Sequence, residues 1–143
     1  MTFLLDVNVL FILHQPRHSD YRIVNRWFAS KSGDSFATCA TTQTGLMRLL
    51  IQDIGGLDRF SFDEACNALD TLTQHPRHVF WPDAPPYLAA AGSLAQRIQG
   101  HRQITDSYLM GLAIRNNAVL ATLDSGIRQL AGAEFAGHIE LIQ

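Results

Sequence analysis

The fold of this chain is decided by the stretch Phe3-Leu4-Leu5-Asp6-Val7-Asn8-Val9-Leu10-Phe11-Ile12-Leu13. Nine of its eleven residues are apolar, and Asp6 is the only one that ionises. Residues 2–5 are typical of a buried strand, and a short helix is predicted to follow Asp6. Burying a lone carboxylate is costly, so such a residue is normally paired, hydrogen-bonded or bound to a metal.

Strands and helices alternate along the rest of the chain. The predicted strands are 2–5, 35–39, 78–81, 118–122 and 138–142. The later helices are predicted at 20–30, 42–52, 63–73, 86–99, 105–116 and 126–130. Ser19 or Asp20 is expected to cap the helix at 20–30, Ser61 or Asp63 the helix at 63–73, and Thr105 the helix at 105–116. This alternation predicts a parallel sheet covered on both faces, a doubly wound α/β fold. Because no repeat or linker interrupts the pattern, residues 1–143 are expected to form one domain.

The composition excludes several classes of protein. The net charge of -2 argues against a basic nucleic-acid-binding tail, and no apolar stretch is long enough to span a membrane. Met1-Thr2 lacks the basic start of a signal peptide. Two cysteines, Cys39 and Cys66, are too few for a disulfide framework and favour a reducing compartment. We therefore expect a cytoplasmic protein.

The basic residues are strongly biased towards arginine. Ten of the eleven are arginine, and Lys31 is the only lysine. The planar guanidinium suits bidentate contacts with phosphate, although a bias in genomic composition explains the same pattern.

Three aspartates are expected at one edge of the predicted sheet, because ligands bind beyond the carboxyl ends of parallel strands. Asp6 follows the first strand, Asp124 follows the fourth, and Asp106 lies in the first turn of a helix. Each also has a purely structural explanation, as a helix cap, a partner of the helix dipole or a turn residue. Crowded together, the three would repel one another unless a hard cation such as Mg²⁺ lay between them.

Four segments in this order resemble the PIN-domain nucleases of the VapC toxin type. They are LDVNVL (5–10), TQTGLMR (42–48), TDSYL (105–109) and ATLDSG (121–126). The resemblance runs essentially end to end and implies a PIN-like, three-layer α/β/α fold with a central parallel sheet. It also implies an endoribonuclease that depends on Mg²⁺, for which Mn²⁺ substitutes. Such a toxin would bind a VapB-like antitoxin as well as its RNA substrate, and would form a homodimer.

Matching by position assigns roles to individual residues. The resemblance implies that Asp6 and Asp106 are the principal Mg²⁺ ligands and that Asp124 is the third catalytic acid. Asn8 and Thr122 are expected either to orient carboxylates and waters or only to bond the backbone. Arg48 is expected either to hold a carboxylate or phosphate or to be a solvated helix residue.

The sequence departs from the family at Gln43, where a glutamate is usual. An amide keeps an oxygen ligand but removes one negative charge, so we expect a single metal or weakened metal binding. The alternative function is a catalytically weakened domain that acts as a regulatory RNA- or protein-binding module. A phosphatase with Asp6 as nucleophile is disfavoured, because Asn8 stands where that chemistry usually has a second acid.

Overall fold

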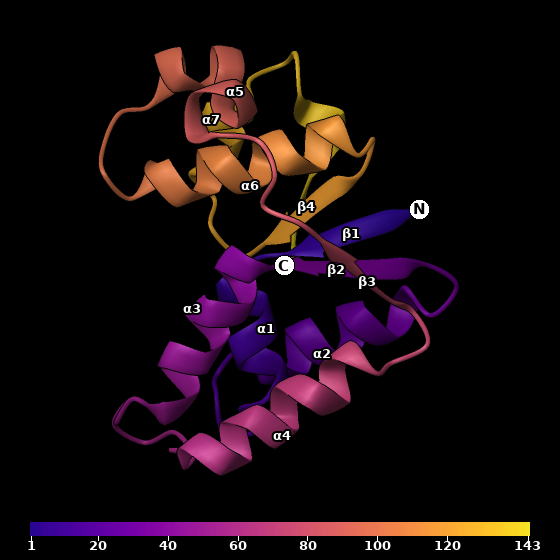
Figure 1. Cartoon of the computed structure of the whole chain (residues 1–143), viewed down its shortest axis with the longest axis vertical. Helices are drawn as coiled ribbons and strands as arrows, with labels where there is room; N and C mark the ends of the chain where they lie inside the picture. Colours follow the sequence, from indigo (N-terminus) through magenta and orange to yellow (C-terminus); the bar gives the residue numbers. More distant parts are fainter.

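A five-stranded parallel sheet forms the centre of the computed structural model, which describes all 143 residues (Figure 1). The strands are β1 (Thr2–Leu5), β2 (Ser35–Cys39), β3 (His78–Trp81), β4 (Val119–Thr122) and β5 (Ile139–Leu141). Their order across the sheet is β3-β2-β1-β4-β5, and each neighbouring pair is parallel. The predicted parallel α/β architecture is confirmed.

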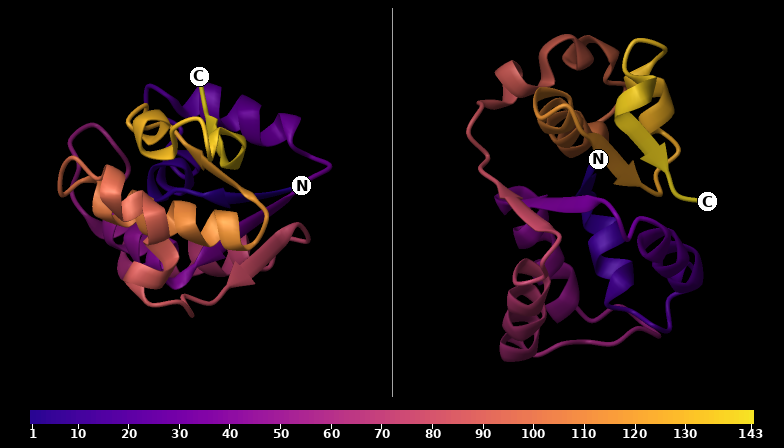
Figure 2. Two further views of the ribbon diagram at one scale, coloured as in Figure 1. Left: turned by 90° about the horizontal axis from the view of Figure 1, so that it is seen from above. Right: turned by 90° about the vertical axis from the view of Figure 1, so that its right-hand side faces the viewer.

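Helices cover both faces of this sheet (Figures 1 and 2). One face carries α1 (Val7–Leu13), α2 (Tyr21–Ser30), α3 (Ala40–Ile51) and α4 (Phe62–Thr73); the other carries α5 (Tyr87–Ala91), α6 (Gln103–Arg115), α7 (Ile127–Ala131) and two 3₁₀ helices, Gly92–Arg97 and Ala136–His138. The protein is thus a three-layer α/β/α structure. None of its helices combines the length and apolarity needed to cross a membrane.

Alternation along the first strand divides the core into two halves. Phe3 and Leu5 lie in the cluster beneath α1–α4, whereas Leu4 lies in the cluster beneath α6 and α7. This follows from the strand geometry, which points successive side chains to opposite faces. A continuous apolar run is therefore what a central strand buried on both faces requires.

The position of β1 in the middle of the sheet brings two distant acids together. β1 pairs with β4 in a register that sets Leu5 beside Ala121. Asp6 and Asp124 each follow the end of one of these neighbouring strands, so both lie at the carboxyl edge of the sheet. Helix α6, which carries Asp106, packs against both strands.

Two sequence predictions about the second half of the chain are wrong in detail. The helix predicted at 86–99 ends at Ala91, because Gly92 adopts φ +51° and the chain continues as a 3₁₀ helix. The helix predicted to be capped by Thr105 begins two residues earlier, at Gln103, and no side chain caps it. Thr105 and Asp106 therefore lie within its first turn, which points Asp106 at the sheet edge.

Helices α5 and α6 approach each other closely at one glycine. A Cβ atom added at Gly111 would stand 2.0 Å from the carbonyl oxygen of Ala90. Only glycine allows this backbone contact. Gly111 therefore sets the distance between α6, which carries Asp106, and α5.

Candidate active site

Asp6 is the buried centre of the acidic site. Its side chain is only 6% exposed, and it caps α1, with Oδ1 accepting the Val7 N–H at 2.7 Å. Its own N–H donates to Ala121 O at 3.1 Å, which extends the pairing of β1 with β4 by one residue. Burial raises the pKa of Asp6, the bonds from Thr122 and Val7 lower it, and the charge of Asp124 raises it.

Thr122 orients the second oxygen of Asp6. The Thr122 Oγ1 donates to Asp6 Oδ2 at 2.7 Å, and the same hydroxyl oxygen accepts the Asp124 N–H at 3.1 Å. Thr122 is 2% exposed, so this hydroxyl is shielded from water. Of the two roles expected for Thr122, the structure therefore shows the contact with a carboxylate.

Asp106 faces the other two acids from α6. Its side chain is half-buried, and burial together with the charges of Asp6 and Asp124 raises its pKa to about 7. No protein hydrogen bond in the structure stabilises its ionised form. Burial is the largest of these effects, and the repulsion from Asp6 and Asp124 adds to it.

Asp124 lies at the rim of the site. It is exposed, and its Oδ1 accepts the Gly126 N–H at 2.8 Å, which shapes the turn that leads into α7. The turn role expected from the sequence is thus present. The same residue contributes charge to the site, because it raises the pKa of both Asp6 and Asp106.

These oxygens fit a hard divalent cation. Each oxygen of Asp6 accepts one hydrogen bond, and a carboxylate oxygen has a second lone pair to offer. The structure contains no group of three His, Cys, Asp or Glu side chains tight enough to hold a metal by itself. Mg²⁺ is commonly held by only one or two carboxylates, completed by water and phosphate oxygens, and Asp6 and Asp106 offer that number.

Gln43 is turned towards a different part of the protein. Its Nε2 donates to Thr38 Oγ1 at 2.9 Å, and Thr38 in turn bonds His78 Nε2 at 2.7 Å on the neighbouring strand. Gln43 also lines a pocket against α4 together with Cys66 and Asp70. No hydrogen bond connects it to an acid of the site.

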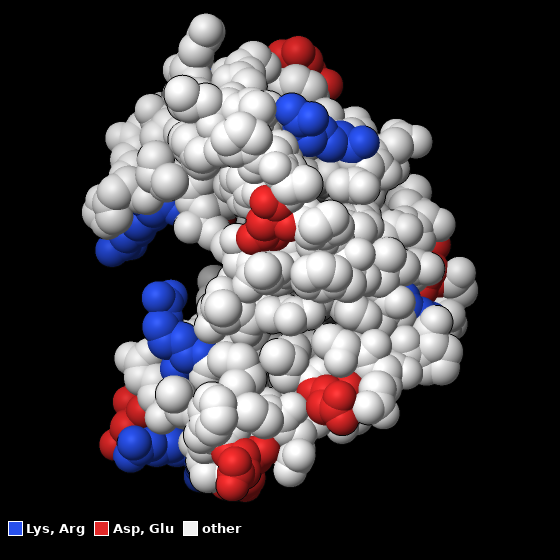
Figure 3. All heavy atoms as spheres, viewed as in Figure 1, with Lys and Arg blue, Asp and Glu red and all other residues white.

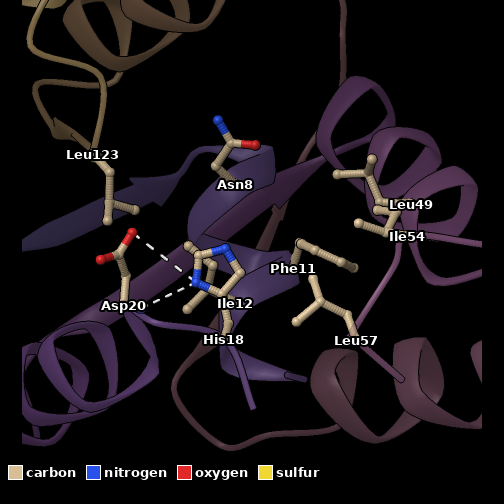
Figure 4. A pocket seen from close by; sticks show the side chains of 9 residues that line it. All are labelled: Asn8, Phe11, Ile12, His18, Asp20, Leu49, Ile54, Leu57 and Leu123. Atoms are coloured by element: carbon tan, nitrogen blue, oxygen red, sulfur yellow. Dashed lines mark hydrogen bonds and ion pairs between the residues drawn. The ribbon is translucent and has the colours of Figure 1, made fainter. Parts of the chain in front are cut away.

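Asn8 lies at the rim of an apolar pocket of about 370 Å³ (Figure 4). Its amide points away from the side chains of Phe11 and Leu57 that form the pocket's apolar wall, and it makes no hydrogen bond within the protein. The side chain is exposed, two residues after Asp6. It is therefore free to bind water or a ligand, but it does not orient a carboxylate in this structure.

Arginines stand on both sides of a deep hollow in the surface. Figure 3 shows basic side chains at its two lips, over the start of α6 and over α3. Arg48 lies in the last turn of α3, and Arg102 directly precedes α6. Both are exposed, and neither belongs to an ion pair. Sequence reasoning singled out Arg48 but missed Arg102, whose only signal was its position four residues before Asp106.

Comparison with known proteins gives a consistent set of relatives, although no family model matches the chain. It is 39% identical over 132 residues to ribonuclease VapC29 of Mycobacterium tuberculosis, which covers 92% of each chain. It is 31% identical over 146 residues to ribonuclease VapC39 of the same organism, covering 99% of this chain and 100% of the relative.

Two solved structures share the fold. VapBC2 from Rickettsia felis, bound to a DNA fragment from its promoter, matches with a TM-score of 0.67 at 15% identity, covering 100% of both chains. FitAcB from Neisseria gonorrhoeae matches with a TM-score of 0.61 at 19% identity, covering 99% of this chain and 96% of the other. At these identities the likeness establishes a common architecture.

Proposed function

The chain belongs to the family of VapC ribonucleases, and from this premise we propose that it is a toxin endoribonuclease whose active site is formed by Asp6, Asp106 and Asp124. The observation that supports the assignment is the hydrogen-bonded link from Asp6 through Thr122 to Asp124 at the ends of β1 and β4, with α6 and its Asp106 packed against both strands. The charges of Asp6 and Asp124 add to the effect of burial in raising the pKa of Asp106, as expected for crowded carboxylates. Such crowding is unfavourable in a purely structural site.

Mg²⁺ is the cation that this donor set suits best, held by Asp6 and Asp106, with Mn²⁺ able to substitute. When bound, the cation supplies charge that offsets the charge developing on the scissile phosphate and makes a bound water more acidic. Asp124, which is exposed at the rim, is proposed to accept a proton from the attacking water. Thr122 keeps Asp6 in a fixed orientation throughout.

Substrate binding is assigned to the hollow between α3 and α6. Basic side chains line both sides of it, and the exposed Arg48 of α3 and Arg102 before α6 are proposed to contact phosphates that flank the cut. The net charge of the protein is -2, so these arginines provide local attraction where the acids alone would repel RNA.

The test is cleavage of labelled RNA by purified, antitoxin-free protein with Mg²⁺. Asp6→Asn and Asp106→Asn should each abolish cleavage while leaving the circular dichroism spectrum unchanged. Asp63→Asn, which alters an exposed acid of α4, is the matched control and should cleave normally. Undiminished cleavage by either site variant would refute the assignment. RNA binding without any cleavage, even in Mn²⁺, would instead favour the regulatory binding module.

A VapB-like antitoxin is the proposed protein partner. The structural neighbours include VapBC2 and FitAcB, whose fold this chain shares. A basic side chain from the partner would bind Asp6 and Asp106 and exclude RNA. Homodimerisation and a cytoplasmic location remain predictions. Light scattering of the purified chain tests whether it forms a homodimer.

A further inference from the structure

A second, smaller pocket lies at the N-terminal end of α6. Its volume is about 250 Å³, and its lining residues are Thr41, Tyr87, Ile104, Thr105 and Tyr108. The last three belong to the first two turns of α6, the segment that also carries Asp106. The pocket and the acidic site are therefore built on the same stretch of helix.

Two tyrosine rings give this pocket a rigid aromatic wall. The rings of Tyr87 and Tyr108 are nearly parallel, with centroids 6.4 Å apart and an interplanar angle of 18°. Tyr87 Oη shares a hydrogen bond of 2.8 Å with Ser107 Oγ, and Tyr108 Oη donates to Pro85 O at 3.0 Å. Because both hydroxyls are anchored, a ligand that stacks here does not have to order the rings first.

The other side chains of the pocket suit a flat, largely apolar ligand. Ile104 is 44% exposed and adds aliphatic surface at the mouth. Thr41 is held in place, because its N–H and hydroxyl both donate to Asp83 Oδ2, at 3.0 and 2.5 Å. The volume lies below the roughly 300–1,000 Å³ of sites for larger ligands, and it matches a single planar ring system better.

The pocket lies at the same edge of the sheet as the acidic site. Thr41 follows β2, and Asp6 follows β1, the next strand in the sheet. Both positions therefore lie at the carboxyl edge of the sheet, after adjacent strands. This shared edge would allow an RNA strand that reaches Asp6 to present one of its bases to Tyr87 and Tyr108.

We propose that this pocket binds one unpaired nucleobase of the RNA, next to the cleaved bond, by stacking against Tyr87 and Tyr108. The inference rests on the proposed ribonuclease function and adds a substrate class to it. Bases within a duplex are stacked on each other and are not available, so the pocket selects single-stranded segments. Aromatic stacking accepts any base, so this subsite requires a base to be present without fixing its identity.

The test measures binding separately from cleavage. The Asp106→Asn protein is titrated with single-stranded RNA that carries the fluorescent base 2-aminopurine at successive positions, since stacking quenches its emission. One position should be quenched strongly. Tyr87→Leu should remove the quenching and weaken binding at least fivefold, as expected for the loss of one base stack. Leu88→Ala, which changes an exposed neighbour outside the pocket, is the matched control and should bind normally.

An abasic scan makes the result independent of how any tyrosine variant folds. Removing the base at the quenched position should weaken binding to the Asp106→Asn protein about as much as Tyr87→Leu does. If the wild-type protein cleaves RNA but no position is quenched, or the tyrosine variant binds equally well, the base subsite is wrong and the ribonuclease assignment stands. If the wild-type protein neither binds nor cleaves RNA, the proposed function itself fails.

Discussion

Thr122 Oγ1 donates a 2.7 Å hydrogen bond to Asp6 Oδ2, and this bond joins the ends of two neighbouring strands, β4 and β1, across the acidic site. The two residues are 116 positions apart in the chain. The bond fixes one carboxylate oxygen while the backbone N–H of Val7 fixes the other. Asp6 is therefore held in one orientation before any cation or substrate arrives.

Removing the Thr122 hydroxyl should weaken catalysis without abolishing it. Thr122→Val keeps the volume but leaves Asp6 Oδ2 without its donor, and we expect kcat/KM for RNA to fall by about 10- to 100-fold. Because that hydrogen bond lowers the pKa of Asp6, the rise of activity with pH should also move to higher pH. Thr122→Ser retains the hydroxyl and serves as the control. A valine variant with an unchanged pH profile would contradict the positioning role.

The Asp106 carboxyl should make the metal-free protein less stable as pH rises. Its pKa is 3.8 in the reference state and about 7 in the fold, so between these values the folded protein binds more protons than the unfolded chain. The free energy of unfolding therefore falls as pH rises from about 4 to about 7. Asp106→Asn removes this dependence and should stabilise the metal-free protein at pH 8 by about 1 kcal/mol after solvent screening.

Thermal melts with and without Mg²⁺ check this directly. The wild-type protein should gain stability from Mg²⁺ at pH 8, and Asp106→Asn should gain less, because binding to the folded state alone raises the melting temperature. RNA cleavage by the wild-type protein should also increase through pH 7 as Asp106 ionises. A melting temperature that rises with pH in the metal-free wild type would be the opposite of the expected sign.

Restoring the family's glutamate at position 43 should not rebuild a metal site. Gln43 donates to the buried Thr38 hydroxyl, and a glutamate has no N–H with which to replace that bond. Gln43→Glu should therefore cost about 1 kcal/mol of stability and leave Mg²⁺ affinity unchanged. Isothermal titration calorimetry and denaturant unfolding measure the two effects. A tenfold gain in Mg²⁺ affinity would show that side chain 43 reaches the acids after all.

The two arginines of the hollow should control how RNA binding depends on salt. In the Asp106→Asn background, Arg48→Ala and Arg102→Ala should each weaken RNA binding and reduce the slope of log K against log salt by about 0.7. Arg22→Ala in α2 is the control, since that arginine is also exposed and free of ion pairs. If all three variants showed the same slope of log K against log salt, the RNA would bind outside the hollow.

The approach of α5 to α6 should tolerate no side chain at position 111. Gly111→Ala forces a Cβ towards Ala90 O, so we expect a loss of about 1–3 kcal/mol and a displaced α6. Gly100→Ala has no neighbour within 4 Å and should change stability little. Denaturant unfolding compares the two. Because α6 carries Asp106, Gly111→Ala should also lose RNA cleavage in proportion to the displacement of α6.

Local pattern was sufficient for most of the fold. The apolar run around Asp6, interrupted by one acid, predicted a strand buried on both faces that leads into a helix, and β1 and α1 are the result. Hydrophobic periodicity did not predict helix ends that depend on the backbone conformation of a single residue. Gly92 and the uncapped start of α6 carry no signal in hydrophobic periodicity, so the ends of those helices were misplaced.

The sequence by itself determined the chemistry that this protein has available: a central parallel sheet with aspartates just beyond its strands, and the resemblance that named their family. Only the tertiary structure decided which polar groups meet. It joined Thr122 to Asp6 and turned Gln43 towards Thr38 instead of the acids. It also set Tyr87 beside Tyr108. The physical reason is that side-chain periodicity is a local property, whereas a hydrogen bond or a pKa shift depends on strand order and helix packing over the whole chain.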